Sequence, residues 1–311
     1  MRARLFAAFA AVYLVWGSTY LAIRFAVETL PPLLMAGTRF VVSGLILMAW
    51  ARWREGAAIP SKLDWRTGAI SGGLLLLGGN GAVAWAEQRV PSGIAALLVA
   101  IVPLWMVVLE WMRPGGRRPA FAVFAGVSLG LVGLLLLVGP DSLRGRGDAN
   151  TFGALVLVVA SLSWAAGSLY TKWAPRSSSG TVGAATQMLA GGILLIIAGV
   201  LFGEPARLDL AHVSTRSLLG FAYLVTFGSL IGFTAYLYLL AHTTAAKAAT
   251  YAYVNPVVAV LLGWAIGHEP VTTRTLLAAA VILAGVAIIT VTRDSVPALP
   301  ATDAGEAARA Q

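Results

Sequence analysis

The sequence predicts an all-α integral membrane protein, with ten transmembrane helices arranged as two inverted five-helix repeats. Three observations support this prediction. Of the 311 residues, 59% are hydrophobic and only 11% are charged, whereas soluble domains contain about 25% charged residues. The apolar residues gather in ten segments of about 20 residues, the length that spans a bilayer. Finally, a short motif near the N-terminus returns in the second half of the chain.

The bulk composition also argues against several classes of protein. A formal net charge of +9 would suggest nucleic acid for a soluble protein, but basic residues gather in the cytoplasmic loops of membrane proteins, so no nucleic-acid partner is expected. The chain has no cysteine, which excludes disulfides and thiol nucleophiles. His212, His242 and His268 are far apart and show no metal-ligand spacing, so we expect neither a metal nor a cofactor.

The first apolar segment could be a signal peptide or a transmembrane helix. Arg2 and Arg4 precede an apolar run that begins at Leu5, as in a signal peptide. The run continues through Tyr20 and Ile23, however, and many similar segments follow it. This length favours a first transmembrane helix.

Proline, glycine and charge clusters divide the rest of the chain into helices with short connections. The predicted helices are 5–26, 32–51, 67–86, 92–112, 119–139, 152–171, 181–202, 216–240, 246–267 and 274–292. They form a first repeat over residues 5–139 and a second over residues 152–292. Residues 293–311 are mostly small and polar, which predicts a disordered cytoplasmic tail.

The distribution of Lys and Arg predicts the orientation. With both termini in the cytoplasm, thirteen basic residues lie at inner ends and loops and six at outer ones, which agrees with the positive-inside rule. The inner set is Arg2, Arg4, Arg52, Arg54, Lys62, Arg66, Arg113, Arg117, Arg118, Lys172, Arg176, Lys247 and Arg293, and the outer set is Arg89, Arg144, Arg146, Arg207, Arg216 and Arg274.

Two pairs of matching segments indicate the internal repeat. Trp16-Gly17-Ser18-Thr19-Tyr20 is echoed by Trp164 and Gly167-Ser168-Leu169-Tyr170, and Gln187 stands near the place that Arg39 would occupy. The segments that contain Pro103 and Pro256 match in the same way. Because each half has an odd number of helices, the second half must enter the membrane from the opposite side. Inverted repeats of this kind are common in secondary transporters, with the substrate site near the midplane between the halves.

These motifs resemble the drug/metabolite transporter superfamily, EamA branch. The resemblance covers residues 5–292 and depends on Trp-Gly-Ser-Thr-Tyr in helix 1, Pro-x7-Arg ending at Arg39, and Asn-Pro-Val-Val-Ala-Val-Leu-Leu-Gly from Asn255 onward. It implies an inner-membrane exporter of amino acids or other small metabolites. The first half lacks the Gly-His-Glu that ends at Glu269 in the second half, so no mechanistic role is assigned to that acid.

Arg39 is the charged residue that most needs a role. It lies about seven residues inside its helix, where an Arg costs about 3 kcal/mol on insertion scales. Such residues usually mark substrate paths, although Arg39 could instead anchor loop carbonyls at the outer end. The resemblance also places an Arg here. Glu87 and Glu110 both sit near helix ends, so no partner carboxylate is evident from sequence.

Helix 1 carries a second informative face. Trp16, Tyr20, Arg24 and Glu28 follow one another at i+4 spacing and therefore share one side of the helix. For Arg24 and Glu28, an interfacial belt with a snorkelling Arg is favoured. Trp16 lies deeper, and it could either line a pocket or pack against neighbours.

Helix breakers and small residues suggest where the helices bend and touch. Pro103 and Pro256 would each free a mid-helix carbonyl at equivalent places, which points to hinges beside a central binding region or to kinks used only for packing. Gly126 and Gly130 form a close-packing face. That face could serve contacts within the chain or a homodimer.

The sequence therefore predicts a transporter with a cavity between the halves. Its predicted lining is Trp16, Thr19, Tyr20, Arg39, Asn80, Trp164, Ser168, Gln187, Tyr251 and Asn255. Aromatic and amide groups with a single cation suit a small zwitterion or carboxylate. The chain has no P-loop, and no acid or His cluster, so neither an enzyme nor an ATP-driven pump is expected. The alternative is a membrane scaffold or sensor without a substrate. The expected partners of the predicted transporter are a small-molecule substrate and the lipid bilayer.

Overall fold

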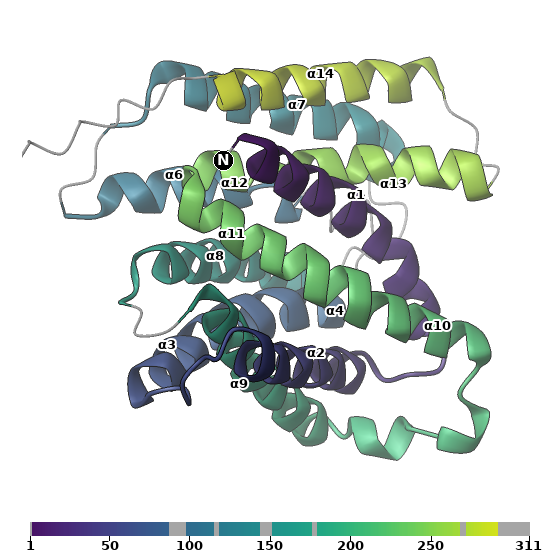
Figure 1. Cartoon of the computed structure of the whole chain (residues 1–311). Coiled ribbons are helices and arrows are strands. Elements are labelled where there is room, and N and C mark those ends of the chain that lie inside the picture. The colour runs from purple at the N-terminus through teal and green to yellow at the C-terminus, as the bar shows by residue number, and fades with distance from the viewer. Residues whose placement is uncertain are drawn as a thin grey trace, which may run out of the picture.

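The computed structural model describes residues 2–86, 98–114, 118–143, 151–175, 179–267 and 272–291, and this part is helical with short connections and contains no strand (Figure 1). The first half contains α1 (Arg2–Ala26), α2 (Pro32–Arg54), α3 (Lys62–Gly72), the π-helix η1 (Gly73–Gly81), α4 (Ala82–Ala86), α6 (Val102–Met112) and α7 (Phe121–Leu143). The second half contains α8 (Thr151–Trp173), α9 (Gly180–Leu201), the short 3-10 helices η2 (Glu204–Arg207) and η3 (Leu210–His212), α10 (Thr215–Tyr223), the π-helix η4 (Leu224–Phe233), α11 (Thr234–His242), α12 (Ala245–Ala248), α13 (Tyr251–Gly267) and α14 (Thr273–Val291).

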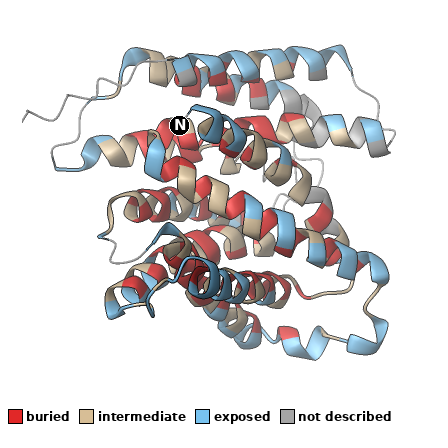
Figure 2. Ribbon diagram, in the orientation of Figure 1, coloured by how far each residue is buried: buried red, intermediate tan, exposed pale blue. Residues whose placement is uncertain are grey.

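Helix length and composition identify this as a membrane protein. Five continuous helical stretches of the described chain are long and apolar enough to cross a bilayer: 32–54, 62–86, 152–173, 180–201 and 215–242. Shorter apolar helices cover 102–112, 121–133 and 276–289. Large apolar side chains are exposed, among them Phe121 and Trp53. Exposed positions recur along many of the helices (Figure 2). The all-α prediction is therefore confirmed, and the count of ten spans stays a prediction.

Corresponding helices of the two halves lie side by side. In Figure 1, α7 and α14 form a pair at one edge of the bundle, and α2 and α9 form a pair at the other. Both crossings are close because glycines meet there. A Cβ atom on Gly37 of α2 would lie 2.8 Å from the Gly192 carbonyl oxygen of α9, and one on Gly126 of α7 would lie 2.9 Å from the Gly285 carbonyl oxygen of α14. Only glycine allows backbones to approach this closely.

The close-packing face in α7 is used within the chain. Gly126 faces Gly285, and a Cβ atom on Gly130 would lie 3.1 Å from the Tyr253 ring. Of the two alternatives that the sequence left open, contact within the chain is therefore the one observed. A homodimer would need a different surface.

The two prolines do not sit in equivalent surroundings. Pro256 lies inside α13, but Pro103 lies in the first turn of α6, directly after a turn at residues 100–101. The prediction that Pro103 lies in the middle of a helix is therefore wrong within the described residues, since Pro103 is in the first turn of α6. A proline suits a first helical turn because the backbone donor that it lacks would have no intrahelical partner there. The predicted helix 246–267 is likewise divided, since residues 249–250 form a turn between α12 and α13.

Side-chain caps fix two of the helix starts. Ser61 and Asp64 form a capping box, which explains why α3 begins at Lys62 and not at the predicted residue 67. The carboxylate of Glu204, which is buried, accepts hydrogen bonds from the backbone amides of Leu33 at 3.1 Å and Leu34 at 2.8 Å. The segment after α9 therefore caps the N-terminus of α2 and ties the two halves together at that end.

Candidate functional site

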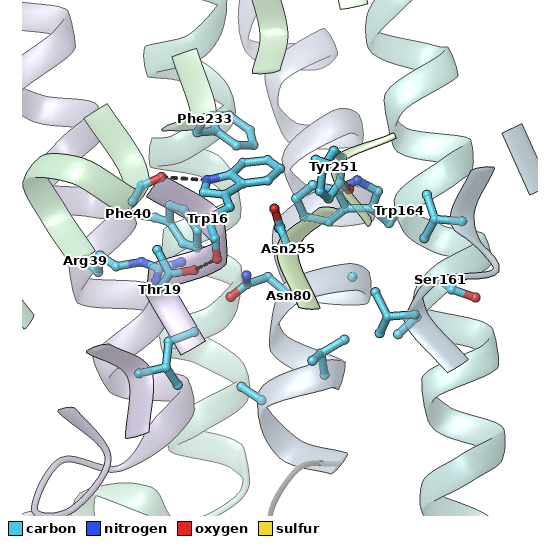
Figure 3. Close-up of a pocket in the computed structure, with 18 residues that line it drawn as sticks. Trp16, Thr19, Arg39, Phe40, Asn80, Ser161, Trp164, Phe233, Tyr251 and Asn255 are labelled. Carbon is cyan, nitrogen blue, oxygen red and sulfur yellow. Dashed lines mark hydrogen bonds between the residues drawn. The ribbon is translucent and has the colours of Figure 1, made fainter. Parts of the chain in front are cut away.

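The centre of the bundle contains a cavity of about 130 Å³ between the two halves. We call it the first cavity (Figure 3). Its lining comes from α1, α2, η1, α4, α6, α8, η4 and α13, with residue 99 just before α6. The lining residues are Trp16, Thr19, Ile23, Arg39, Phe40, Gly79, Asn80, Val83, Ala84, Val99, Val102, Ala160, Ser161, Trp164, Gly228, Phe233, Tyr251 and Asn255. Drug-sized pockets measure about 300–1,000 Å³, so this one suits a small molecule.

Two π-helices form opposite parts of the wall. The segment η1 contributes Gly79 and Asn80, and η4 contributes Gly228 and Phe233. A π-helix displaces backbone carbonyls from the usual ladder and often marks a functional site. Here the indole nitrogen of Trp16 donates a hydrogen bond of 3.0 Å to the carbonyl oxygen of Gly228 (Figure 3).

Each of these π-helices makes room for a tryptophan of the other half. A Cβ atom on Gly79 would lie 2.8 Å from the Trp164 ring, and one on Gly232 would lie 2.4 Å from the indole nitrogen of Trp16. The glycines of η1 and η4 therefore allow both indoles to reach the cavity. In both halves, the Trp that precedes the Gly-Ser-x-Tyr motif thus packs against a π-helix glycine of the other half.

Four aromatic rings meet beside the first cavity, and we call them the aromatic cluster: Trp16, Trp164, Tyr236 and Tyr251. The Trp16 ring lies 5.8 Å from that of Trp164, 5.1 Å from that of Tyr236 and 4.8 Å from that of Tyr251, centroid to centroid. The Tyr236 ring in turn lies 5.8 Å from Trp164 and 5.4 Å from Tyr251. These contacts join α1, α8, α11 and α13.

Ser168 supports this cluster without lining the cavity. Its hydroxyl and that of Tyr236 are hydrogen-bonded at 2.6 Å, and both residues are fully buried. The indole nitrogen of Trp164 also donates to the Tyr236 oxygen at 3.3 Å. Ser168 therefore holds the cluster in place through Tyr236.

Arg39 supplies the positive charge of the first cavity. It is 5% exposed, and no other Lys, Arg, Asp, Glu or His occurs among the described lining residues. Its guanidinium carbon lies 4.2 Å from the centroid of the Phe40 ring, and its Nε has no hydrogen-bond partner. Within the described ranges no carboxylate lies within 4.0 Å of it. Among the described residues this buried charge thus has no counter-charge, which is costly unless a ligand or water completes the site.

Two asparagines add polar groups near Arg39. Asn80 comes from η1 and Asn255 from α13, and both appear at the centre of the cavity in Figure 3. The Oδ1 atom of Asn255 is buried without a hydrogen-bond partner. Buried amide oxygens normally find a donor, so this one is available to a ligand.

Gln187 lies in a different cavity, which we call the second cavity. Its volume is about 370 Å³, and it is formed by α3, α8, α9 and α11 with the short connection before α9. The lining residues are Asp64, Thr67, Gly68, Thr171, Pro175, Ser179, Gly180, Thr181, Gly183, Ala184, Thr186, Gln187, Thr234, Leu237, Tyr238, Ala241 and His242. Ten residues were predicted to line one shared cavity. The first cavity brings together seven of them, namely Trp16, Thr19, Arg39, Asn80, Trp164, Tyr251 and Asn255.

The remaining predicted residues have other outcomes. The backbone of Tyr20 belongs to α1, but its side chain lies outside what the structure describes, as do that of Arg24 and the whole of Glu87. Glu28 pairs with Arg216 at 3.4 Å, so this acid contacts the other half of the chain. Glu110 lines neither cavity.

Sequence reasoning missed several residues at the centre. Phe40, Ser161 and Phe233 line the first cavity, and Tyr236 completes the aromatic cluster. Phe40 follows Arg39 directly and could have been found from that position. The other three are ordinary residues of apolar helices, and only the packing of those helices distinguishes them. Among the described residues, no group of three or more His, Asp or Glu could hold a metal ion.

Comparison with known proteins decides the family. The model of the EamA-like transporter family matches residues 3–139 and again residues 151–291. The chain belongs to the EamA-like transporter family. It is 41% identical over 297 residues to the inner membrane transporter YedA of Escherichia coli (strain K12), covering 95% of this chain and 94% of YedA. It is also 26% identical over 281 residues to the transporter YoaV of Bacillus subtilis (strain 168), covering 90% and 94% of the two chains.

A solved structure shares the fold of this EamA-like chain. A crystal structure matches 93% of this chain and 97% of its own with a TM-score of 0.75 and 21% sequence identity. The match shows a common fold and nothing about its ligand. Together with the family, the relatives confirm that the protein is a membrane transporter of small molecules and not an enzyme.

Proposed function

We propose that this protein is an inner-membrane secondary transporter that exports an amino acid or a similar small metabolite. The first cavity would be its substrate site. The observation that supports the proposal most is the buried Arg39 guanidinium, which has no carboxylate partner among the described residues and lines a cavity otherwise composed of apolar, aromatic and uncharged polar groups. A substrate carboxylate would compensate this charge through two parallel hydrogen bonds.

The other groups of the cavity have complementary roles in this proposal. The amides of Asn80 and Asn255 would bind polar groups of the substrate, and Thr19 would flank Arg39. Trp16, Trp164 and Tyr251 would pack against its apolar part, as aromatic rings do in most small-molecule pockets. Ser168 would act through Tyr236 and not by direct contact. Gln187 would bind substrate in the second cavity.

Transport in this proposal proceeds by alternating access between two inverted repeats, with both termini in the cytoplasm. One half would rock against the other about the first cavity. The break between α12 and α13, with Pro256 following it, would allow such motion, and the turn directly before α6, with Pro103 following it, would allow it in the other half. The absence of a P-loop from the sequence leaves a gradient, or downhill flow, as the driving force.

Counterflow in proteoliposomes tests this function. Purified protein is reconstituted, vesicles are loaded with pools of unlabelled amino acids, and the uptake of labelled ones is followed. We expect uptake for at least one pool, and its loss in Arg39→Gln with the protein still folded. Uptake that survives Arg39→Gln would move the substrate site elsewhere. If folded protein shows no counterflow with any pool, the amino-acid assignment fails, and a scaffold or sensor role becomes the better hypothesis.

A further inference from the structure

The second cavity has the opposite chemical character to the first, and among its lining residues the proposed mechanism gives a role to Gln187 alone. It is the larger of the two, at about 370 Å³. Its described lining contains no Lys or Arg, and its ionisable side chains other than Tyr238 are Asp64 and His242.

Two threonine hydroxyls of the second cavity donate their protons within their own helices. Thr186 and Thr234 each donate to a carbonyl one helical turn earlier, at Val182 and Leu230 respectively. Such back-bonding uses the hydroxyl proton and leaves the oxygen as an acceptor. These side chains therefore present hydrogen-bond acceptors, and not donors, to the space between the helices.

The N-terminus of α9 would ordinarily attract an anion, but it already holds one. The hydroxyls of Ser179 and Thr181 donate to the carboxylate of Glu55, at 3.2 Å and 2.8 Å. This carboxylate offsets the positive end of the helix dipole. The nearby ammonium group of Lys172 donates to the carbonyl of Thr243, and Lys172 does not line the cavity.

Gln187 completes the acceptor set. The residue is 4% exposed, lines the second cavity, and its Oε1 atom is buried without a hydrogen-bond partner. A buried amide oxygen without a donor is costly, which indicates that a group outside the described chain supplies one. Thr186, directly before it, is fully buried and adds a second acceptor oxygen.

We infer that the second cavity is a binding site for a protonated amine, and that it holds the amino end of the substrate before or after the first cavity holds its carboxylate. An ammonium group has three donors and no acceptor, which matches the hydroxyl and amide oxygens of this wall. This inference depends on the proposed function, because it assigns the site to an amino-bearing substrate of the same transporter.

Thermal unfolding of the purified protein in detergent tests the site with simple probes. Propylammonium chloride, sodium propionate and propanol are compared at pH 7, each at a range of concentrations, with sodium chloride as the salt control. A ligand that binds only the folded state raises the melting temperature. We expect propylammonium to stabilise the wild type and Arg39→Gln, and propionate to stabilise the wild type and Gln187→Leu.

Two substitutions at Gln187 make the test specific. Gln187→Leu removes an acceptor that has no partner, so folding should be retained, and the apparent affinity for propylammonium should fall about tenfold. Gln187→Glu adds a negative charge at the same place and should raise that affinity about tenfold. Propanol, which is uncharged, should give no Gln187-dependent shift in any variant.

The outcomes separate this inference from the proposed function. If the propylammonium effect is absent, or is the same in both Gln187 variants as in the wild type, the amine site is wrong even when counterflow persists. If sodium alone gives the Gln187-dependent shift, the cavity binds an alkali cation and the amine assignment is overturned. If propylammonium binds as expected while no amino-acid pool shows counterflow, the site stands and the proposed transport of amino acids fails.

Discussion

The two cavities differ in the residue that corresponding helices place in each. Arg39 on α2 lies in the first cavity, and Gln187 on α9, which stands near the corresponding place of the second half, lies in the second. The helices α2 and α9 are neighbours. One half thus presents a buried cation and the other a buried neutral acceptor. The internal repeat thus gives the two halves a similar helix arrangement, while differences at single corresponding residues give each cavity its own polar groups.

The aromatic cluster joins two helices beside the first cavity. On α8, Ser168 falls between Trp164 of the first cavity and Thr171 of the second. Along η4 and α11, Phe233 of the first cavity is followed directly by Thr234 of the second, and Tyr236 comes after both. The hydrogen bond between Ser168 and Tyr236 therefore joins α8 to α11 in a region where each helix carries residues of both cavities.

The largest effect should come from abolishing the charge difference. Arg39→Gln gives both cavities a neutral amide, and the rate of counterflow should fall about a hundredfold because a charge-assisted bidentate contact is lost. Arg39→Lys retains the charge without the planar fork and should restore only part of the rate. Initial rates in proteoliposomes measure both variants. Equal rates in Arg39→Gln and the wild type would mean that the charge of the first cavity plays no part in transport.

A change of shape in the first cavity should have the next largest effect. Gly79→Ala would drive a methyl group to within 2.8 Å of the Trp164 ring, and overpacking of this kind costs about 1–3 kcal/mol. We expect the transport rate to fall about tenfold. Gly73→Ala is the matched control on the same π-helix, since its Cβ atom meets only Leu194 at 3.5 Å. Similar rates for the two variants would show that the position of Trp164 is not important.

Weakening the contact between α8 and α11 should have a smaller effect. Ser168→Ala removes the hydrogen bond to Tyr236, which is worth about 1 kcal/mol, so we expect the KM for counterflow to rise about fivefold. The control is Ser18→Ala. Ser18 is the matching serine of the first half, and its hydroxyl bonds that of Tyr223 at 2.6 Å, away from both cavities. An equal change in the two variants would contradict a specific role for the Ser168–Tyr236 contact.

The smallest effect on transport should come from the cap that ties α2 to the segment after α9. Glu204→Gln weakens a charge-assisted cap and should lower the free energy of unfolding by about 1 kcal/mol. The residue lines neither cavity, so the KM for counterflow should not change. Thermal unfolding and counterflow on the same preparation measure the two quantities. A raised KM would show that the α2–α9 frame itself adjusts the binding geometry.

The sequence alone was sufficient for the class, the family and much of the cavity. Apolar segments must span a bilayer, and an Arg inside one of them needs an interior position because lipid offers it no partner. The repeated motif indicates Trp16 and Trp164. The amides of Asn80 and Asn255 are indicated because an amide group in the hydrocarbon interior needs a hydrogen-bond partner. These arguments need only the solvent and the residue type.

Only the tertiary structure decided which of these residues lie together. Gln187 belongs to the second cavity because α9 packs against α3 and α11, and no local pattern reports that packing. Tyr236 and Phe233 have the same apolar surroundings in sequence as lipid-facing residues nearby, yet both are buried at the centre. Pro103 starts a helix and does not bend one, since a proline is compatible with a first turn as well as with a kink. Distances between helices depend on side chains from distant parts of the chain, and they are fixed only when all of these pack.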